Sequence, residues 1–278
     1  IDTSAAEKMK GVRAVVTAAD FPDIPSEEAF VGEGPMNFRD LSLNIIAREK
    51  VLYDGHVVAA VAATSNSIAK AAAEAIKVEY EVLPHVINEI EAMAADAPIL
   101  HDDLITAGVD PKPTKPSNVA KRIEFSTGDL EAGFAAADKI VERTFTTAPV
   151  HQAYIEPHAC VAAFSPDGQC QVICSSQGQF MVRAYCAKLL GLDISEIRVT
   201  PSEIGGGFGG KTLVYLEPLA LALSRKAGRP VRMVMTREEV FRGTGPTSGG
   251  TIKVKIGAKK DGTITAADAE VILQAGAF

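Results

Sequence analysis

The chain has 278 residues, of which 47% are hydrophobic and 23% are charged. This is the composition of a globular protein with one or two domains, and it excludes disorder as the dominant state. The formal net charge of -7 argues against nucleic-acid binding through phosphate contacts, and no apolar run reaches the roughly 18 residues that a membrane span needs.

The first hundred residues combine short strands with one helix. β-Branched and alternating runs predict strands at Val12–Thr17, Leu52–Tyr53, Val57–Ala63 and Val78–Val82. Asp54–Gly55 indicates a hairpin or tight turn between the second and third of these runs. Asn66 is a candidate N-cap for a helix that runs through Ile76, whereas the proline- and glycine-rich stretch 21–40 is expected to be a loop.

A polar stretch with three prolines, His101–Ser117, predicts a boundary between two domains. The expected division is a first domain over 1–105, a linker over 106–120 and a second domain over 121–278. The chain begins at Ile1 and ends in the strand-like run Val271–Phe278. We therefore expect it to be a piece of a longer polypeptide.

The second half alternates strands, turns and helices. The predicted strands are Lys139–Thr147, Cys160–Phe164, Gln169–Cys174, Ile197–Thr200, Val231–Met235, Ile252–Ile256 and Thr263–Leu273. The predicted helices are a short one after the N-cap Asp129, one over Gln179–Leu190 that Gly191 ends, one over 213–227 that Pro218 bends, and one that the capping box Thr236–Glu239 opens. Turn sequences at Ser165–Gly168 and Lys259–Gly262 predict two hairpins.

The four cysteines, Cys160, Cys170, Cys174 and Cys186, include no C-x-x-C pair. This spacing argues against a zinc ribbon or a ferredoxin-type cluster within the chain. We expect free, mostly buried thiols, which are typical of a reducing compartment and therefore of a cytoplasmic protein.

The strongest local signal is the glycine loop, Gly205–Thr212, which follows a predicted strand and precedes a predicted helix. Its backbone N–H groups favour an anionic ligand. The segment also satisfies the P-loop pattern of nucleotide-binding proteins, but Pro201–Ile204 separates it from the strand, and no apolar strand ending in Asp follows for magnesium. The structural alternative is that these glycines only allow a strand and a helix to pack closely.

Five segments in this order resemble the xanthine dehydrogenase/aldehyde oxidase family of molybdenum hydroxylases. They are Gly128–Phe134, Tyr154–His158, Cys174–Gln179, Gly205–Lys211 and Gly228–Glu239. Upstream, Val51–Ala62 and Val78–Leu83 resemble the small hammerhead domain of that family. The resemblance implies an α+β fold, in which a hammerhead-like domain lacking its N-terminal part precedes the first part of a molybdenum-cofactor-binding domain.

The resemblance also implies a function and its partners. The expected reaction is the oxidative hydroxylation of a small-molecule aldehyde or N-heterocycle, with water as the oxygen source. The expected cofactor is molybdenum-molybdopterin, in its plain or cytosine dinucleotide form. Electrons would pass to [2Fe–2S] clusters and FAD on other domains or subunits, so we expect an oligomeric complex that includes the remainder of the molybdenum subunit.

The candidate site residues follow from the same resemblance. Gly206, Gly207, Phe208 and Gly209 are expected to contact the cofactor through backbone N–H groups, with Phe208 beside the metal and over the substrate. Gln177 is expected to donate a hydrogen bond to an oxygen ligand of the metal. The alternatives are that Phe208 is a core residue and that Gln177 is a polar cap on the helix after it.

Two positions limit the resemblance. Thr212 stands where the xanthine-oxidising members have a purine-binding glutamate. Thr212 is therefore expected to line a substrate pocket that suits a non-purine. The family's catalytic glutamate is expected downstream of Phe278, so this segment contains no catalytic residue of its own.

Two further interpretations remain. Glu156 and His158 are interpreted as a structural pair rather than as an acid–base pair. The alternative function from another class is a non-catalytic assembly fragment that binds no cofactor.

Overall fold

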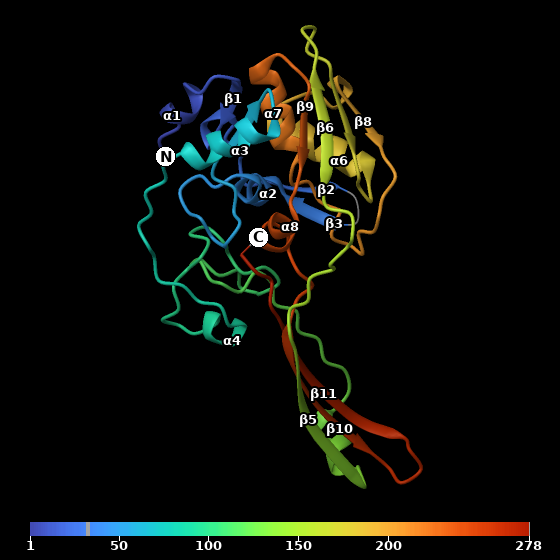
Figure 1. Cartoon of the computed structure of the whole chain (residues 1–278). Coiled ribbons are helices and arrows are strands. Elements are labelled where there is room, and N and C mark those ends of the chain that lie inside the picture. Colours follow the sequence, from blue (N-terminus) through green and yellow to red (C-terminus); the bar gives the residue numbers. More distant parts are fainter. Residues whose placement is uncertain (32–33, 278) are drawn as a thin grey trace. The chain divides into compact units, whose positions relative to one another are not determined.

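The computed structural model describes residues 1–31 and 34–277, which form two compact units (Figure 1). Unit 1 comprises Ile1–Glu81 and His151–Gly245, and unit 2 comprises Val82–Val150 and Pro246–Ala277. Each unit is thus built from separate stretches of chain. These units describe how the chain packs and are not sequence domains. The predicted division into domains, with a linker over 106–120, therefore stays a prediction.

A four-stranded sheet lies in unit 1, with the strand order β8-β7-β6-β9. Its strands are β6 (Ala159–Phe164), β7 (Cys170–Cys174), β8 (Ile197–Pro201) and β9 (Val231–Val234). β7 and β8 are parallel, and the other neighbours are antiparallel. The predicted hairpin between β6 and β7 is confirmed, with Gly168 at a φ of +89° in its turn. Alternate residues of β7 are buried, as its period-two pattern requires.

Two helices cover this sheet. α6 (Gln179–Leu190) packs against β8, and α7 (Glu217–Ala227) packs against β6, β7 and β9. Glycines at a left-handed φ end both helices, namely Gly191 at +65° and Gly228 at +61°. The prediction of a bent helix over 213–227 was wrong. α7 begins only at Glu217, so Pro218 lies in its first turn. N–H groups in the first turn have no acceptor within the helix, so proline is tolerated there without a bend.

Unit 1 also contains the N-terminal elements and α8 (Arg237–Gly243). The N-terminal elements are α1 (Ser4–Glu7), β1 (Val12–Val16), β2 (Glu28–Val31), β3 (Gly34–Asn37), α2 (Phe38–Ile45), β4 (Ala60–Ala63) and α3 (Asn66–Ala75). Two 3-10 turns, Ala18–Asp20 and Ile194–Glu196, complete it. β1 pairs antiparallel with β4, and α7 packs against both, so α7 is central to unit 1.

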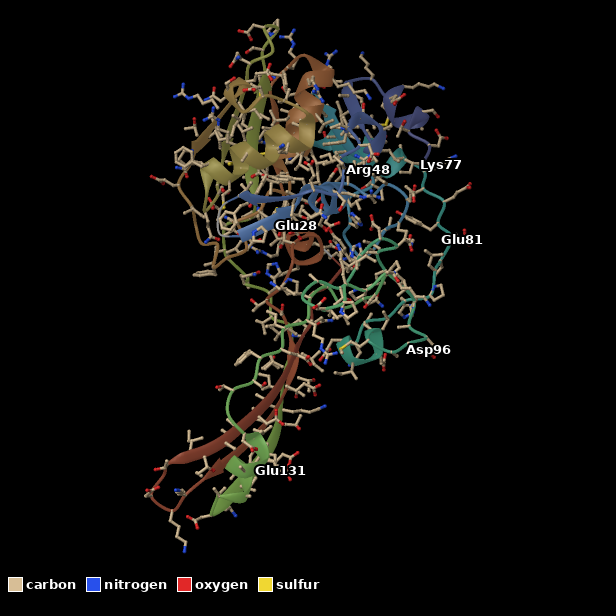
Figure 2. The ribbon with its side chains drawn as sticks, turned by 180° about the vertical axis from the view of Figure 1, so that it is seen from behind. Glu28, Arg48, Lys77, Glu81, Asp96 and Glu131 are labelled. Carbon is tan, nitrogen blue, oxygen red and sulfur yellow. The ribbon has the colours of Figure 1, made fainter. Side chains whose placement is uncertain are left out.

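Two N-terminal predictions were wrong, and a third was correct in part. The stretch 21–40 holds β2, β3 and the start of α2 rather than a loop. Asp54–Gly55 forms the tight turn that was one of the two predicted forms, closed by the His56 N–H on the Tyr53 carbonyl oxygen at 3.2 Å, but β4 pairs with β1, so it is not a hairpin. Val78–Val82 alternates like a strand, but none of the described strands pairs with it, and Tyr80 and Val82 are exposed. Figure 2 labels Lys77 and Glu81 along this extended segment.

Unit 2 is built on a three-stranded antiparallel sheet with the order β11-β10-β5 (Figure 1). Its elements are α4 (Glu89–Ala92), α5 (Leu130–Ala135), β5 (Lys139–Thr147), β10 (Gly250–Ala258) and β11 (Ile264–Leu273). The predicted β10–β11 hairpin and the Asp129 cap of α5 are confirmed. α5 packs on β11, where a Cβ at Gly133 would lie 2.5 Å from the Thr265 carbonyl oxygen.

The apolar core lies in unit 1. Its larger cluster joins the inner face of the four-stranded sheet to α2, α6, α7 and the β1–β4 pair. All four cysteines are free and buried, as predicted, and burial raises the pKa of Cys174 to about 12. Among the described residues of unit 2, Ala266 is the one buried hydrophobic residue. No helix in the described ranges is long and apolar enough to cross a membrane.

Candidate functional site

The glycine loop, Gly205–Thr212, connects β8 to α7 within unit 1. Three of its residues have a left-handed φ, namely Gly206 at +95°, Phe208 at +50° and Gly209 at +90°. Glycine adopts this region freely, whereas for a phenylalanine it is strained by about 1 kcal/mol or more. The surroundings therefore hold the loop in one conformation. The Phe208 side chain is 75% exposed, so the alternative of a core phenylalanine is wrong.

One side of the loop is packed against side chains. A Cβ at Gly205 would lie 2.6 Å from Cβ of Glu156, and one at Gly207 would lie 2.4 Å from Oε1 of Gln177. Neither position can accept a larger residue without movement of its neighbour. At Gly209, by contrast, a Cβ would meet nothing within 4 Å. The loop is thus tightly held on one side and open on the other.

Gln177 holds the loop through its carboxamide oxygen. Its Oε1 accepts hydrogen bonds from the N–H of Gly209 (3.0 Å) and the N–H of Lys211 (3.1 Å). Its own backbone N–H donates to the Lys211 carbonyl oxygen at 2.9 Å. Two backbone donors fix which end of the carboxamide is oxygen, so the other end is the NH₂ group, on a residue that is exposed. Gln177 is not the cap of α6, because Gly178 occupies the N-cap position.

Lys211 lies beneath the loop as a buried ammonium group. Its side chain is 0% exposed, and its Nζ lies 2.7 Å from Oε2 of Glu156. The same Oε2 accepts a hydrogen bond from the N–H of Gly205 at 2.8 Å. Burial raises the pKa of Glu156, but the hydrogen bonds from Lys211 and Gly205 outweigh it and leave that pKa below its ordinary value. The Glu156 carboxyl group is therefore ionised near neutral pH.

This geometry counts against the P-loop alternative. A P-loop lysine must reach the phosphates of a nucleotide, whereas the Lys211 side chain is buried and bonded to Glu156. α7 begins only at Glu217, so no helix N-terminus directly follows Thr212.

A buried polar cluster supports the loop from below. The Tyr154 hydroxyl lies 2.6 Å from Nε2 of His158 and 3.3 Å from Oγ1 of Thr244, which also contacts Nε2 of His151 at 2.8 Å. The Tyr154 ring lies 5.0 Å from Nζ of Lys211. Burial and the nearby Lys211 charge lower the pKa of His158 to about 4, so its ring is neutral near pH 7.

The predicted pairing of Glu156 with His158 is not what the structure shows. Glu156 bonds Lys211 and the loop, whereas His158 bonds the Tyr154 hydroxyl. The sequence analysis also missed Lys211 and Tyr154 as supports of the loop. The available signal was a lysine directly after the glycines, together with an acidic residue in the segment Tyr154–His158.

Thr212 lines a small apolar pocket of about 180 Å³. Its Oγ1 donates a hydrogen bond to the Gly209 carbonyl oxygen at 2.9 Å. The other lining residues are Val31, Gly34, Pro35, Met36, Met181, Tyr185 and Leu213. Phe208, which was predicted to share a substrate pocket with Thr212, is not among the residues that line this one. None of the described residues that line it is acidic or basic, and most of them are apolar.

The donors that remain at the loop suit an oxygen-rich anion. The N–H groups of Gly206, Gly207 and Phe208 donate to no other residue in the described ranges, and neither does the Gln177 NH₂ group. Oε1 of Gln152 is buried without a partner among the described residues, and its Cδ would lie 3.3 Å from a Cβ at Gly210. Loop glycines and neutral amides can thus approach such a ligand closely.

Side chains alone do not make a metal centre here. In the described ranges, no group of three or more His, Cys, Asp or Glu residues could hold a metal ion.

Comparison with known families identifies both halves of the chain. Residues 1–84 match the family described as aldehyde oxidase and xanthine dehydrogenase, a/b hammerhead domain. Residues 111–278 match the molybdopterin cofactor-binding domain family. These matches fall on the two regions for which the sequence motifs indicated a resemblance.

Individual relatives are much longer than this chain. A probable xanthine dehydrogenase subunit of Bacillus subtilis is 32% identical over 99% of this chain, which spans 34% of that relative. The nicotinate dehydrogenase large molybdopterin subunit of Eubacterium barkeri is 29% identical over the whole chain, which spans 60% of that relative.

The fold is shared with solved structures as well. Quinoline 2-oxidoreductase from Pseudomonas putida 86 superposes with a TM-score of 0.81 and 27% identity over 97% of this chain, which covers 33% of that structure. An α+β architecture was expected from the sequence, and this neighbour and the mixed elements above confirm it. The chain belongs to the xanthine dehydrogenase/aldehyde oxidase family of molybdenum hydroxylases, and it corresponds to part of their molybdopterin-binding large subunit.

Proposed function

We propose that this chain is the molybdopterin-binding segment of a molybdenum hydroxylase that oxidatively hydroxylates an aldehyde or an N-heterocycle. The observation that carries the proposal is the glycine loop, whose N–H groups at Gly206, Gly207 and Phe208 have no acceptor in the described ranges, and to which Gln177 is bonded through Oε1. These N–H groups and the NH₂ group of Gln177 are neutral donors, which suit the anionic oxygens of a molybdenum-pterin group.

Each loop residue has a distinct task in this proposal. When bound, the molybdenum cofactor supplies the two-electron oxidation, with water as the source of oxygen. Gln177 donates a hydrogen bond to an oxygen of the cofactor without adding charge. The glycine N–H groups orient the cofactor, and the exposed Phe208 ring bounds the substrate space beside it. The base that completes the reaction belongs to a glutamate beyond residue 278 of the longer chain.

The substrate is proposed to be a non-purine. Thr212 presents a hydroxyl that bonds the Gly209 carbonyl oxygen, and the described residues that line its pocket are uncharged. A purine with several polar edges would leave buried groups unpaired there. Efficient turnover of xanthine by the complete enzyme would contradict this part of the proposal.

Electron transfer is proposed to run through [2Fe–2S] clusters and FAD on other domains or subunits of an oligomeric complex. The four buried cysteines of this chain provide no cluster site of their own. Iron, sulfide and flavin that co-purify with the complete enzyme would support these partners.

The first test is metal analysis with pterin fluorescence on the complete native complex. We expect molybdenum and an oxidised pterin near one each per copy of this chain. Protein from cells that make the cofactor, yet containing neither molybdenum nor pterin, would overturn the proposal. It would favour a non-catalytic assembly fragment that binds partners but no cofactor.

A further inference from the structure

The ion pair beneath the glycine loop differs from the exposed pairs of the chain. Lys211 is 0% exposed in its side chain, and Glu156 is 35% exposed. The pair between Lys253 and Glu270 has nearly the same length, 2.8 Å, but both side chains are 57% exposed. Removing an ammonium group from water costs several kcal/mol unless a close anion compensates, so the Lys211 position calls for a specific explanation.

Lys211 connects the two side chains that hold the loop. Its ammonium group bonds Oε2 of Glu156, which also accepts from the N–H of Gly205, the first residue of the loop. Its backbone N–H and carbonyl bond Gln177, at 3.1 Å and 2.9 Å. The two anchors of the loop are therefore joined through one buried residue.

We propose that Glu156 and Lys211 are a positioning pair, which sets where the loop N–H groups and the Gln177 carboxamide lie. The inference rests on the proposed function for the identity of what is positioned, but not for the positioning itself. Lys211 is fully buried, so its side chain acts through its neighbours. Glu156 fixes the start of the loop, and Lys211 carries that constraint through its backbone to Gln177.

The contrasting possibility is a pair that stabilises unit 1 as a whole and leaves the loop conformation to other contacts. The two roles predict different effects when the ion pair is removed. Loss of a positioning pair frees the amides of Gly205, Gly209 and Lys211, which are donors to Glu156 and Gln177. Loss of a merely stabilising pair lowers the melting temperature without a local effect at the loop.

The test uses the complete chain, purified without cofactor, and measures amide hydrogen exchange over Gly205–Lys211. The variants are Glu156→Leu, Lys211→Met and the double variant, which removes the acceptor of the Gly205 N–H together with the buried ammonium group and leaves no unpaired buried charge. The matched control replaces the exposed pair with Lys253→Met and Glu270→Leu. We expect about tenfold or faster exchange at the loop in the double variant and in each single variant that folds, and no change at the loop in the control.

The outcomes are separable from those of the proposed function. Unchanged loop exchange in the double variant, with a lowered melting temperature, would overturn the positioning role. Loop exchange that rises equally in the control pair would overturn it as well. The measurement needs no bound molybdenum, so an enzyme found to lack the metal would refute the proposed function and leave this result standing. In cofactor-loaded protein, we further expect the double variant to retain less pterin after gel filtration than the control.

Discussion

Gln177 has two ends with different tasks, and isosteric variants separate them. Gln177→Glu keeps an oxygen for the N–H groups of Gly209 and Lys211 but loses the NH₂ donor. Gln177→Leu loses both. We expect both variants to lower turnover by the complete enzyme about tenfold to 100-fold, as is typical of residues that support a metal group.

Only Gln177→Leu should also speed amide exchange at the loop, because only it removes the acceptor. The control is Gln171→Glu, since Gln171 is an exposed glutamine on the neighbouring part of β7. Turnover by Gln177→Glu at the level of that control would show that the NH₂ group is not used.

His158 makes the stability of unit 1 depend on pH. Its pKa is lowered from 6.5 to about 4 in the folded protein, so between these values the unfolded chain binds more protons. The contribution of His158 is present above pH 6.5 and is lost as the pH falls towards 4. It amounts to about 3 kcal/mol over that range, at 1.36 kcal/mol for each pH unit.

Urea titrations at pH 4.5, 5.5 and 6.5 measure this slope. We expect His158→Gln to flatten it, whereas His85→Gln, at an exposed histidine, should leave it unchanged. An identical slope in the parent chain and His158→Gln would show that another group dominates the acid response.

At the scale of elements, local signals were sufficient wherever the chain folds on its immediate neighbours. The turn Ser165–Gly168, the stop at Gly191 and the capping box of Thr236–Glu239 all lie where the sequence indicated. Failures occurred where pairing is distant in sequence. β4 pairs with β1, which lies more than forty residues earlier in the chain. Val78–Val82 has the alternation of a strand, but none of the described strands pairs with it. No local pattern carries that information.

The residues of the candidate site likewise divide into those that the sequence indicated and those that only the folded chain shows. The glycines and Gln177 were indicated by sequence motifs, because close backbone approach leaves a compositional signal. The buried connection from Lys211 to Glu156 spans 55 positions of sequence, so only the folded chain shows it. The roles of these residues towards a cofactor stay predictions that the proposed experiments test.

The end of α7 offers a test of one element. Gly228 has a φ of +61°, and a Cβ there would meet nothing within 4 Å. Substitution therefore strains only the backbone. We expect Gly228→Ala to lower the free energy of unfolding by about 1 kcal/mol, and Gly228→Asn to lower it by less, since asparagine tolerates this region better.

Urea unfolding of the three proteins checks the order of these effects. Arg229→Ala, at the exposed residue that follows Gly228, serves as the control for a surface substitution. Equal stability of Gly228→Ala and the parent chain would mean that the helix end relaxes out of its left-handed conformation.

At the scale of the whole molecule, buried apolar side chains and the candidate site belong to the same unit. The glycine loop, Gln177, Glu156 and the polar cluster around Tyr154 all come from unit 1, whose sheet and helices supply both core clusters. Rigid elements thus hold a loop that carries unusual backbone angles.

Unit 2 should be the less protected part of this chain. Its sheet has regular backbone bonds, yet large side chains such as Ile140, Phe145, Val271 and Leu273 are exposed, and Ala266 is its one buried hydrophobic residue in the described ranges. Opening of such a unit exposes little new apolar surface, so its free energy is low. In native-state hydrogen exchange on residues 1–278, we expect amides of β10 and β11 to open at least about 3 kcal/mol more readily than those of β6 and β7. Equal protection of the two sheets would contradict this, because hydrogen-bonded pairing alone would then account for the stability of unit 2 without a buried core.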